Sequence, residues 1–141
     1  MKKIVAVIWI TVLGMTQLAD ASSYQYVTAE ELKGWLESEK SVLLVDIQVE
    51  KEFAAHHIKG SLETNSYPVK SGADRKRLDP VIELNNHTND YRAVVVVCPR
   101  GKGGAKRAYD YLKKAGVTAN KLYILTGGMA NWPYPKLVAE K

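Results

Sequence analysis

The sequence predicts a single α/β domain, with a mostly parallel central sheet and helices on both faces. Three apolar runs, at residues 41–47, 93–98 and 122–125, have the near-continuous hydrophobicity of strands that are covered on both sides. Helical patterns separate these runs, and strands that alternate with helices favour parallel pairing. The length of 141 residues, 46% of them hydrophobic, is typical of one globular domain.

The elements between the strands begin with a clear helix. Thr28 and Glu31 form a capping box that predicts a helix through Leu36. Residues 50–57 are predicted to form a short helix, and residues 61–64 to be extended.

Two further segments complete the expected order of elements. Leucine and valine spacing in residues 70–89 indicates a helix, whose limits are blurred by Pro80 and an Asn-rich end. Residues 105–115 have a small apolar face and end on lysines before Gly116, which predicts a helix that stops there.

Residues 1–21 have the pattern of a cleaved secretory signal peptide. Two lysines precede an apolar run at residues 4–13, and residues 19–21 form a small-x-small cleavage motif. An uncleaved anchor is the alternative, but a spanning helix needs about 20 apolar residues, so we expect no stable membrane anchor. We therefore expect an exported protein with one domain at residues 22–141, periplasmic if the source is a Gram-negative bacterium and secreted otherwise.

Cys98 is the only cysteine, so the chain cannot form an internal disulfide. A buried, inert thiol is one interpretation of a lone cysteine. Its position favours another, because Cys98 directly follows the apolar run 93–97 and precedes a glycine-rich loop that opens a helix. Ligands of α/β sheets collect at the carboxyl ends of strands, and helix N-termini offer unpaired N–H groups.

The loop after Cys98 is predicted to be an anion-binding cup. Its three glycines allow the backbone to turn its amides inward. Such a cup, with help from Arg100 and Lys102, favours the thiolate form of the cysteine. The sequence therefore predicts a cysteine nucleophile for an anionic substrate.

Three segments resemble the motifs of the single-domain rhodanese-like sulfurtransferases. The stretch CPRGKGG followed by AKRAYDYLKKAG is similar to the active-site loop and helix of that family. The stretch VDIQVEKEFAAHHIKGS resembles the upstream Asp-x-Arg and Glu-[Tyr/Phe]-x-x-Gly-His-Ile-x-Gly-Ala motif, and LTGGMANW resembles the downstream Gly-Gly-x-x-x-Trp motif. The motifs occur in order over roughly residues 27–136.

This resemblance implies a fold, a reaction and a set of site residues. It implies that Cys98 is catalytic and carries a persulfide, in the transfer of a sulfane sulfur from a small anionic donor such as thiosulfate to cyanide or a thiol. A sulfur-relay protein is a further candidate partner, and neither a metal nor an organic cofactor is implied. The implied substrate-binding residues are Pro99, Arg100, Gly101, Lys102, Gly103 and Gly104. The implied structural supports are Asp46, His57, Gly60, Gly127, Gly128 and Trp132.

The sequence also departs from the family pattern at four positions. Gln48 replaces an arginine and so removes a supporting ion pair, and His56 replaces a glycine. Pro99 lacks an N–H donor, and Gly103 stands where many members have a basic or hydroxyl-bearing side chain.

Two alternative functions share the same cysteine loop. A carrier module would hold a persulfide or an anion for a partner without turnover. A cysteine phosphatase or an arsenate-type reductase would use Cys-x5-Arg, whose arginine clamps the oxyanion, but position 104 is glycine here.

Metal and nucleic-acid sites are not expected. His56 and His57 would point about 100° apart on a helix and so could not share an ion, even with His87 nearby. The basic runs at residues 74–77 and 106–107 are short, and the net charge of the whole chain is only +5, so they are interpreted as solvated surface.

Overall fold

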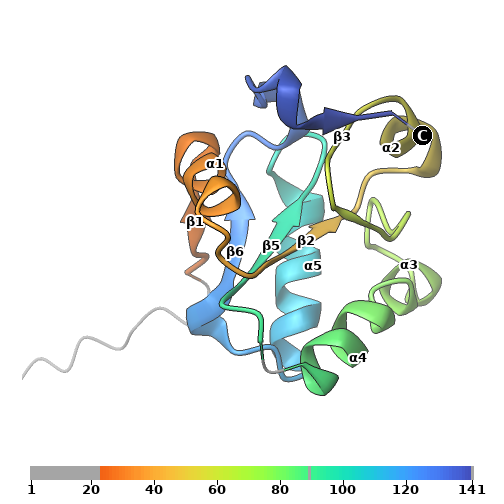
Figure 1. The fold of residues 1–141 in the computed structure, drawn as a ribbon. Coiled ribbons are helices and arrows are strands. Elements are labelled where there is room, and N and C mark those ends of the chain that lie inside the picture. Colours follow the sequence, from red (N-terminus) through yellow and green to blue (C-terminus); the bar gives the residue numbers. More distant parts are fainter. Residues whose placement is uncertain (1–22, 89, 141) are drawn as a thin grey trace, which may run out of the picture.

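The computed structural model describes residues 23–88 and 90–140, which fold around a five-stranded parallel sheet (Figure 1). The strand order is β1-β6-β5-β2-β4. The strands are β1 (Tyr26–Val27), β2 (Val42–Asp46), β4 (Leu62–Glu63), β5 (Ala93–Val97) and β6 (Leu122–Leu125). A separate antiparallel pair joins β3 (His57–Ile58) to β7 (Val138–Ala139). The predicted α/β fold with a mostly parallel sheet is confirmed.

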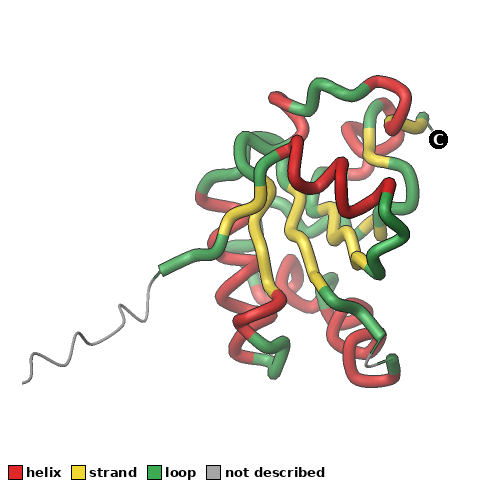
Figure 2. Tube along the Cα trace, turned by 60° about the vertical axis from the view of Figure 1, so that its left-hand side comes forward, coloured by secondary structure: helices red, strands yellow, loops and turns green. Residues whose placement is uncertain are grey.

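Helices lie on both sides of the sheet (Figures 1 and 2). They are α1 (Ala29–Glu37), α2 (Glu50–Ala55), α3 (Gly72–Lys76), α4 (Asp79–His87) and α5 (Gly103–Lys114). Three short 3-10 turns follow later in the chain, at η1 (Ala119–Lys121), η2 (Met129–Asn131) and η3 (Pro135–Leu137). Within residues 23–88 and 90–140, none of the helices combines the length and apolar character needed to cross a bilayer.

The two faces of the sheet bury two separate cores, which explains the continuous apolar runs. In β5 all five residues are buried, and Val94 and Val96 pack with α5 while Val95 and Val97 pack on the α1 side. A strand covered on both faces has no position left for a solvated polar side chain. Because β5 lies in the middle of the sheet, its carboxyl end opens onto the loop that leads to α5.

The boundaries differ from the sequence prediction in a few places. The segment 70–89 contains two helices, because the Ser71 capping box starts α3 and Pro80 lies in the first turn of α4, where no N–H is needed. Helix α5 begins two residues earlier than predicted, at Gly103. The helix predicted over residues 50–57 ends at Ala55, so His56 is extended and His57 lies in β3, and the two histidines do not share a helix as predicted. The two-residue strands β1, β3 and β7 were not predicted. The predicted signal peptide, residues 1–21, lies outside the described residues.

Candidate active site

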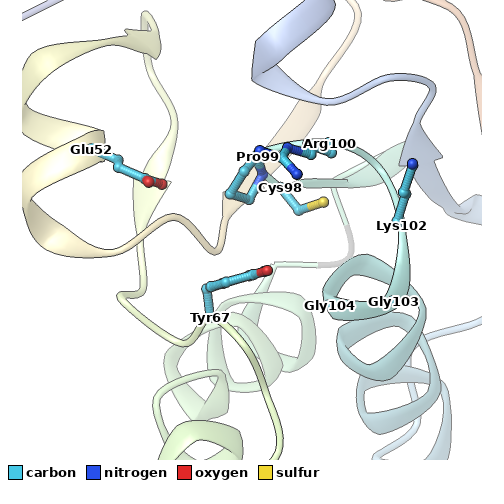
Figure 3. Close-up of a pocket in the computed structure, with 8 residues that line it drawn as sticks. All are labelled: Glu52, Tyr67, Cys98, Pro99, Arg100, Lys102, Gly103 and Gly104. Atoms are coloured by element: carbon cyan, nitrogen blue, oxygen red, sulfur yellow. The ribbon is translucent and has the colours of Figure 1, made fainter.

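Cys98 lies directly after β5, at the edge of the sheet where the parallel strands end. Its side chain belongs to the core on the α5 face, and only 2% of the residue is exposed. The loop at residues 98–102 connects β5 to α5, so the thiol lies between the end of a central strand and the start of a helix (Figure 3). This is the position that the sequence predicts for a ligand site.

The backbone of the loop contacts the sulfur directly. The Gly101 amide donates a hydrogen bond to Cys98 Sγ at 2.8 Å. Gly101 has a φ of 69°, in the left-handed region that glycine adopts without a steric penalty. No described side chain caps the start of α5, so the first-turn amides add the partial positive charge of a helix N-terminus without a side-chain acceptor. The arrangement thus places a backbone hydrogen-bond donor and the N-terminal end of a helix next to the sulfur.

The turn after β6 packs against this loop and is joined to it by backbone hydrogen bonds. The Met129 amide donates to the Cys98 carbonyl, and the Ala130 amide donates to the Pro99 carbonyl, both at 2.9 Å. Gly128 has a φ of 58°, and a Cβ at this position would overlap the Cys98 carbonyl oxygen. Only a residue without a side chain fits between the turn and the loop.

Cys98 opens into a pocket of about 280 Å³ that is built from three distant segments (Figure 3). The segments are α2, the stretch between β4 and α3, and the β5–α5 loop together with the first turn of α5. The lining residues are Glu52, Tyr67, Cys98, Pro99, Arg100, Lys102, Gly103 and Gly104. All the substrate-binding residues implied by the resemblance thus gather at one site, with Gly101 reaching the sulfur through its amide.

Two of the lining residues, Glu52 and Tyr67, were not predicted to belong to the site. Glu52 is the glutamate of the upstream motif and lies in a predicted short helix, but it was not expected to line the pocket, and Tyr67 falls in a stretch with no predicted element. Their approach to Cys98 depends on how separate segments fold back onto the sheet. The motif around Glu52 is a local signal, whereas no pattern around Tyr67 indicates its approach to Cys98.

Asp46 is a buried carboxyl group beside the end of β5, held by a neutral partner. The backbone and side-chain nitrogens of Gln48 donate to its two oxygens, at 2.9 and 3.1 Å. The same Gln48 side chain donates to the His56 carbonyl at 3.0 Å. Burial raises the pKa of Asp46 to about 6, although the hydrogen bonds from Gln48 act in the opposite direction. Gln48 therefore supplies hydrogen bonds but not the charge of an ion pair.

His57 and Gly60 shape the chain next to the pocket without lining it. The His57 ring stacks on Phe53 with the ring centres 3.9 Å apart, and its Nδ1 lies 2.7 Å from the Phe53 carbonyl oxygen. Gly60 lies between β3 and β4 with a φ of 82°. Both residues fix the path from α2 into the sheet.

Gly127 and Trp132 likewise lie outside the pocket. Trp132 is buried in the core on the α1 side and meets the Tyr134 ring edge-on at 5.2 Å. Gly127 has a φ of 75°, and a Cβ there would lie 2.6 Å from the side-chain nitrogen of Asn131. Gly127 and Trp132 therefore stabilise the turn after β6, and this turn contacts the loop of Cys98.

The part of the chain that the structure describes contains no cluster of three or more His, Cys, Asp or Glu side chains that could hold a metal ion. His87 lies at the end of α4, where its Nδ1 is 2.8 Å from the Glu83 carbonyl oxygen.

The fold and the site define an α/β protein with a cysteine in the loop between a central strand and a helix N-terminus. The model of the rhodanese-like domain family matches residues 28–133. The chain belongs to the rhodanese-like domain family. A comparison with the curated proteins found no match.

Several solved structures are similar to this chain. Ygr203w, described as a yeast protein tyrosine phosphatase of the rhodanese family, is 19% identical with a TM-score of 0.65, covering 82% of this chain and 92% of its own. An As-Sb reductase from Leishmania major is 19% identical with a TM-score of 0.63, covering 84% of this chain and 87% of its own. A thiosulfate sulfurtransferase from Pseudomonas aeruginosa is 16% identical with a TM-score of 0.60, covering 84% of this chain but 20% of its own. At these identities the likeness shows the fold alone.

Proposed function

We propose that the protein is a sulfurtransferase that moves a sulfane sulfur from thiosulfate, or a similar small anionic donor, to cyanide or a thiol. The observation that carries the proposal is the hydrogen bond from the Gly101 amide to Cys98 Sγ, at 2.8 Å. The pocket around this sulfur also includes two basic residues, Arg100 and Lys102. A cysteine among amide donors and cations has the features of an activated sulfur nucleophile. Membership of the rhodanese-like family supports the same reaction.

In the first half-reaction, the Cys98 thiolate attacks the outer sulfur of thiosulfate. A sulfur–sulfur bond forms at Sγ, the sulfur–sulfur bond of thiosulfate breaks, and the electron pair leaves with sulfite. The outer sulfur keeps the negative charge that it had in thiosulfate, and the charge of the cysteine thiolate is balanced by the charge that leaves on sulfite. Loop amides and the neighbouring cations stabilise the departing dianion.

In the second half-reaction, cyanide or a thiolate attacks the outer sulfur of the persulfide. The new bond joins the acceptor to that sulfur, the bond to Sγ breaks, and its electron pair restores the Cys98 thiolate. The products are thiocyanate or a persulfide of the acceptor. No external oxidant or reductant is needed, because each step exchanges one nucleophile for another.

The substitution Cys98→Ser tests the role of the sulfur. We expect this variant to form no thiocyanate from thiosulfate and cyanide above the uncatalysed rate, because a serine hydroxyl is not ionised near neutral pH. Its circular dichroism and thermal midpoint serve as the control for folding. Retained activity would exclude Cys98 as the nucleophile. A folded wild-type protein that binds thiosulfate but releases neither sulfite nor thiocyanate would favour a carrier module instead.

The loop gives less support to phosphate or arsenate chemistry. Position 104, where a Cys-x5-Arg loop has its arginine, is glycine. Arg107 lies one turn further along α5, but its Nε donates to the Pro68 carbonyl at 2.9 Å, and the residue does not line the pocket of Cys98. The pocket therefore has no arginine at the position that clamps an oxyanion in such enzymes.

We also propose that the protein is exported and that residues 1–21 are removed. The lysine-led apolar run and the small-x-small motif support this proposal. N-terminal sequencing of the protein from its native cells tests it. A mature chain that starts at residue 22 is expected, and a chain that retains Met1 would contradict cleavage.

A further inference from the structure

Two side chains of the pocket have no role in the reaction as proposed. Glu52 enters from α2, and Tyr67 enters from the stretch between β4 and α3. Figure 3 shows Glu52 and Lys102 on opposite sides of Cys98. The pocket thus has a cationic side, where an anionic donor binds, and a second side with different chemistry.

Tyr67 is held firmly although its ring is partly exposed. Its amide donates to the Ile47 carbonyl at 2.8 Å. Its ring lies against Gly104, because a Cβ at that position would come within 2.9 Å of two ring carbons. The residue is 40% exposed, and Figure 3 shows its hydroxyl directed toward the Cys98 side chain. Among the described residues the hydroxyl has no hydrogen-bond partner, so it is free to donate to a group bound on the cysteine.

Glu52 presents a carboxylate to the same space. Figure 3 shows its carboxylate directed toward the pocket. The next residue, Phe53, is buried and stacks on His57, which fixes the orientation of this short helix. Within residues 23–88 and 90–140 no cation forms an ion pair with Glu52. Its negative charge is therefore available to a molecule that enters the pocket.

We propose that Glu52 and Tyr67 form an acceptor subsite for small thiols that carry a protonated amino group. The inference rests on the proposed sulfur transfer and names its acceptor class. An ammonium group two carbons from the sulfur binds the Glu52 carboxylate while the thiolate attacks the outer sulfur of the Cys98 persulfide. The Tyr67 hydroxyl donates a hydrogen bond to that outer sulfur and orients it toward the acceptor.

The attack of an amino thiol forms and breaks the same bonds as the second half-reaction. The acceptor thiolate forms a bond to the outer sulfur, the bond to Sγ breaks, and the electron pair returns to Cys98. The ammonium keeps its proton throughout and contributes only attraction to the carboxylate. A thiol that carries a carboxylate meets like charge at Glu52 and is disfavoured.

Single-turnover transfer from the loaded protein tests this inference. Cys98 is loaded with thiosulfate, excess donor is removed, and loss of the persulfide is followed with cysteamine, mercaptoethanol or mercaptoacetate. These acceptors carry a positive, a neutral and a negative group beside the thiol. For each acceptor the rate of a variant is divided by the wild-type rate, so the intrinsic reactivity of the thiol cancels.

We expect Glu52→Gln to lower the variant-to-wild-type rate ratio for cysteamine by roughly two- to fivefold relative to that for mercaptoethanol, which is the scale of an exposed ion pair. The same ratio for mercaptoacetate should rise. Glu50→Gln is the matched control, since it removes the same charge from the same helix outside the pocket. Tyr67→Phe should slow all three acceptors by a similar factor, because it removes a contact to the persulfide and not to the acceptor.

The outcomes separate this inference from the function on which it rests. The subsite would be overturned if Glu52→Gln gave equal rate ratios for the three acceptors. It would also be overturned if Glu50→Gln changed the ratios with acceptor charge in the same way as Glu52→Gln. Transfer to cyanide but to none of the thiols would also overturn it while leaving sulfur transfer intact. A loaded protein that transfers sulfur to no acceptor at all would overturn the proposed function itself.

Discussion

At position 48, a neutral side chain bonds a buried carboxyl group at the edge of the sheet where Cys98 lies. Gln48 satisfies both oxygens of the buried Asp46 with hydrogen bonds, yet the pKa of that carboxyl still rises to about 6, chiefly through burial. A cation at position 48 would favour the ionised form instead. The consequence is a stability that depends on pH in a mildly acidic range.

We expect the free energy of unfolding to fall as the pH rises from about 4 to about 6. The unfolded chain releases the Asp46 proton near the ordinary pKa of 3.8, whereas the folded protein keeps it until the pKa of about 6. The folded state holds more protons in this window, so raising the pH favours unfolding. Two pKa units correspond to about 3 kcal/mol. Urea unfolding at a series of pH values measures the loss.

Asp46→Asn isolates this contribution from those of the other acids. The variant keeps the shape of the side chain but has no proton to release, so its stability should lack this component of the pH dependence. The difference between wild type and variant should therefore change mainly between about pH 4 and about pH 6. Parallel pH profiles for the two proteins would show that Asp46 titrates at the same pH whether the chain is folded or not.

Neutralising the two cations of the loop should weaken the use of the donor. The pair of substitutions Arg100→Ala and Lys102→Ala is expected to raise the KM for thiosulfate by roughly fivefold, with less effect at high salt, since exposed charges are screened. The double variant Lys113→Ala and Lys114→Ala, at the far end of α5, removes the same number of positive charges and is the control for net charge. An unchanged KM in the variant that lacks Arg100 and Lys102 would show that these side chains do not meet the donor.

The loop of Cys98 and the turn after β6 act as one structural unit. Backbone bonds from Met129 and Ala130 join them, and Gly128 leaves no room for a side chain between them. The position of the sulfur therefore depends on an element about thirty residues later in the chain.

Gly128→Ala should disturb both stability and sulfur transfer. A Cβ there would overlap the Cys98 carbonyl oxygen at a φ of 58°, so we expect a loss of about 2 kcal/mol or more in the free energy of unfolding. Gly34→Ala is the matched control, because its Cβ would meet nothing within 4 Å in α1, and it should stabilise by up to about 1 kcal/mol. Equal urea midpoints for the two variants would contradict this account of the turn.

Elements with a strong local signal were predicted well, and elements that depend on distant partners were not. Local sequence alone predicts four of them, through the apolar runs of β2, β5 and β6 and the capping box of α1. Strands β1, β3 and β7 have two residues each, and they exist because another strand supplies their hydrogen bonds. The 70–89 segment was ambiguous because its two helices are separated by only two residues, Arg77 and Leu78.

At the scale of the whole molecule, the same distinction applies to the site. The Cys98 loop is contiguous in sequence, so its cup and its cations could be predicted from a single stretch. The opposite side of the pocket comes from α2 and from the stretch before α3, and only the folded chain brings Glu52 and Tyr67 to the sulfur. The side of the pocket formed by the Cys98 loop is thus local in sequence, whereas the side formed by Glu52 and Tyr67 depends on the topology of the fold.

The central claim is that Cys98 accepts a sulfur atom, and the intact mass of the folded protein after exposure to thiosulfate tests it most directly. We predict a gain of the mass of one sulfur atom on the peptide that contains Cys98. Cyanide or a thiol reductant should remove this gain, and Cys98→Ser should not acquire it. A folded wild-type protein whose mass is unchanged by saturating thiosulfate would contradict the claim.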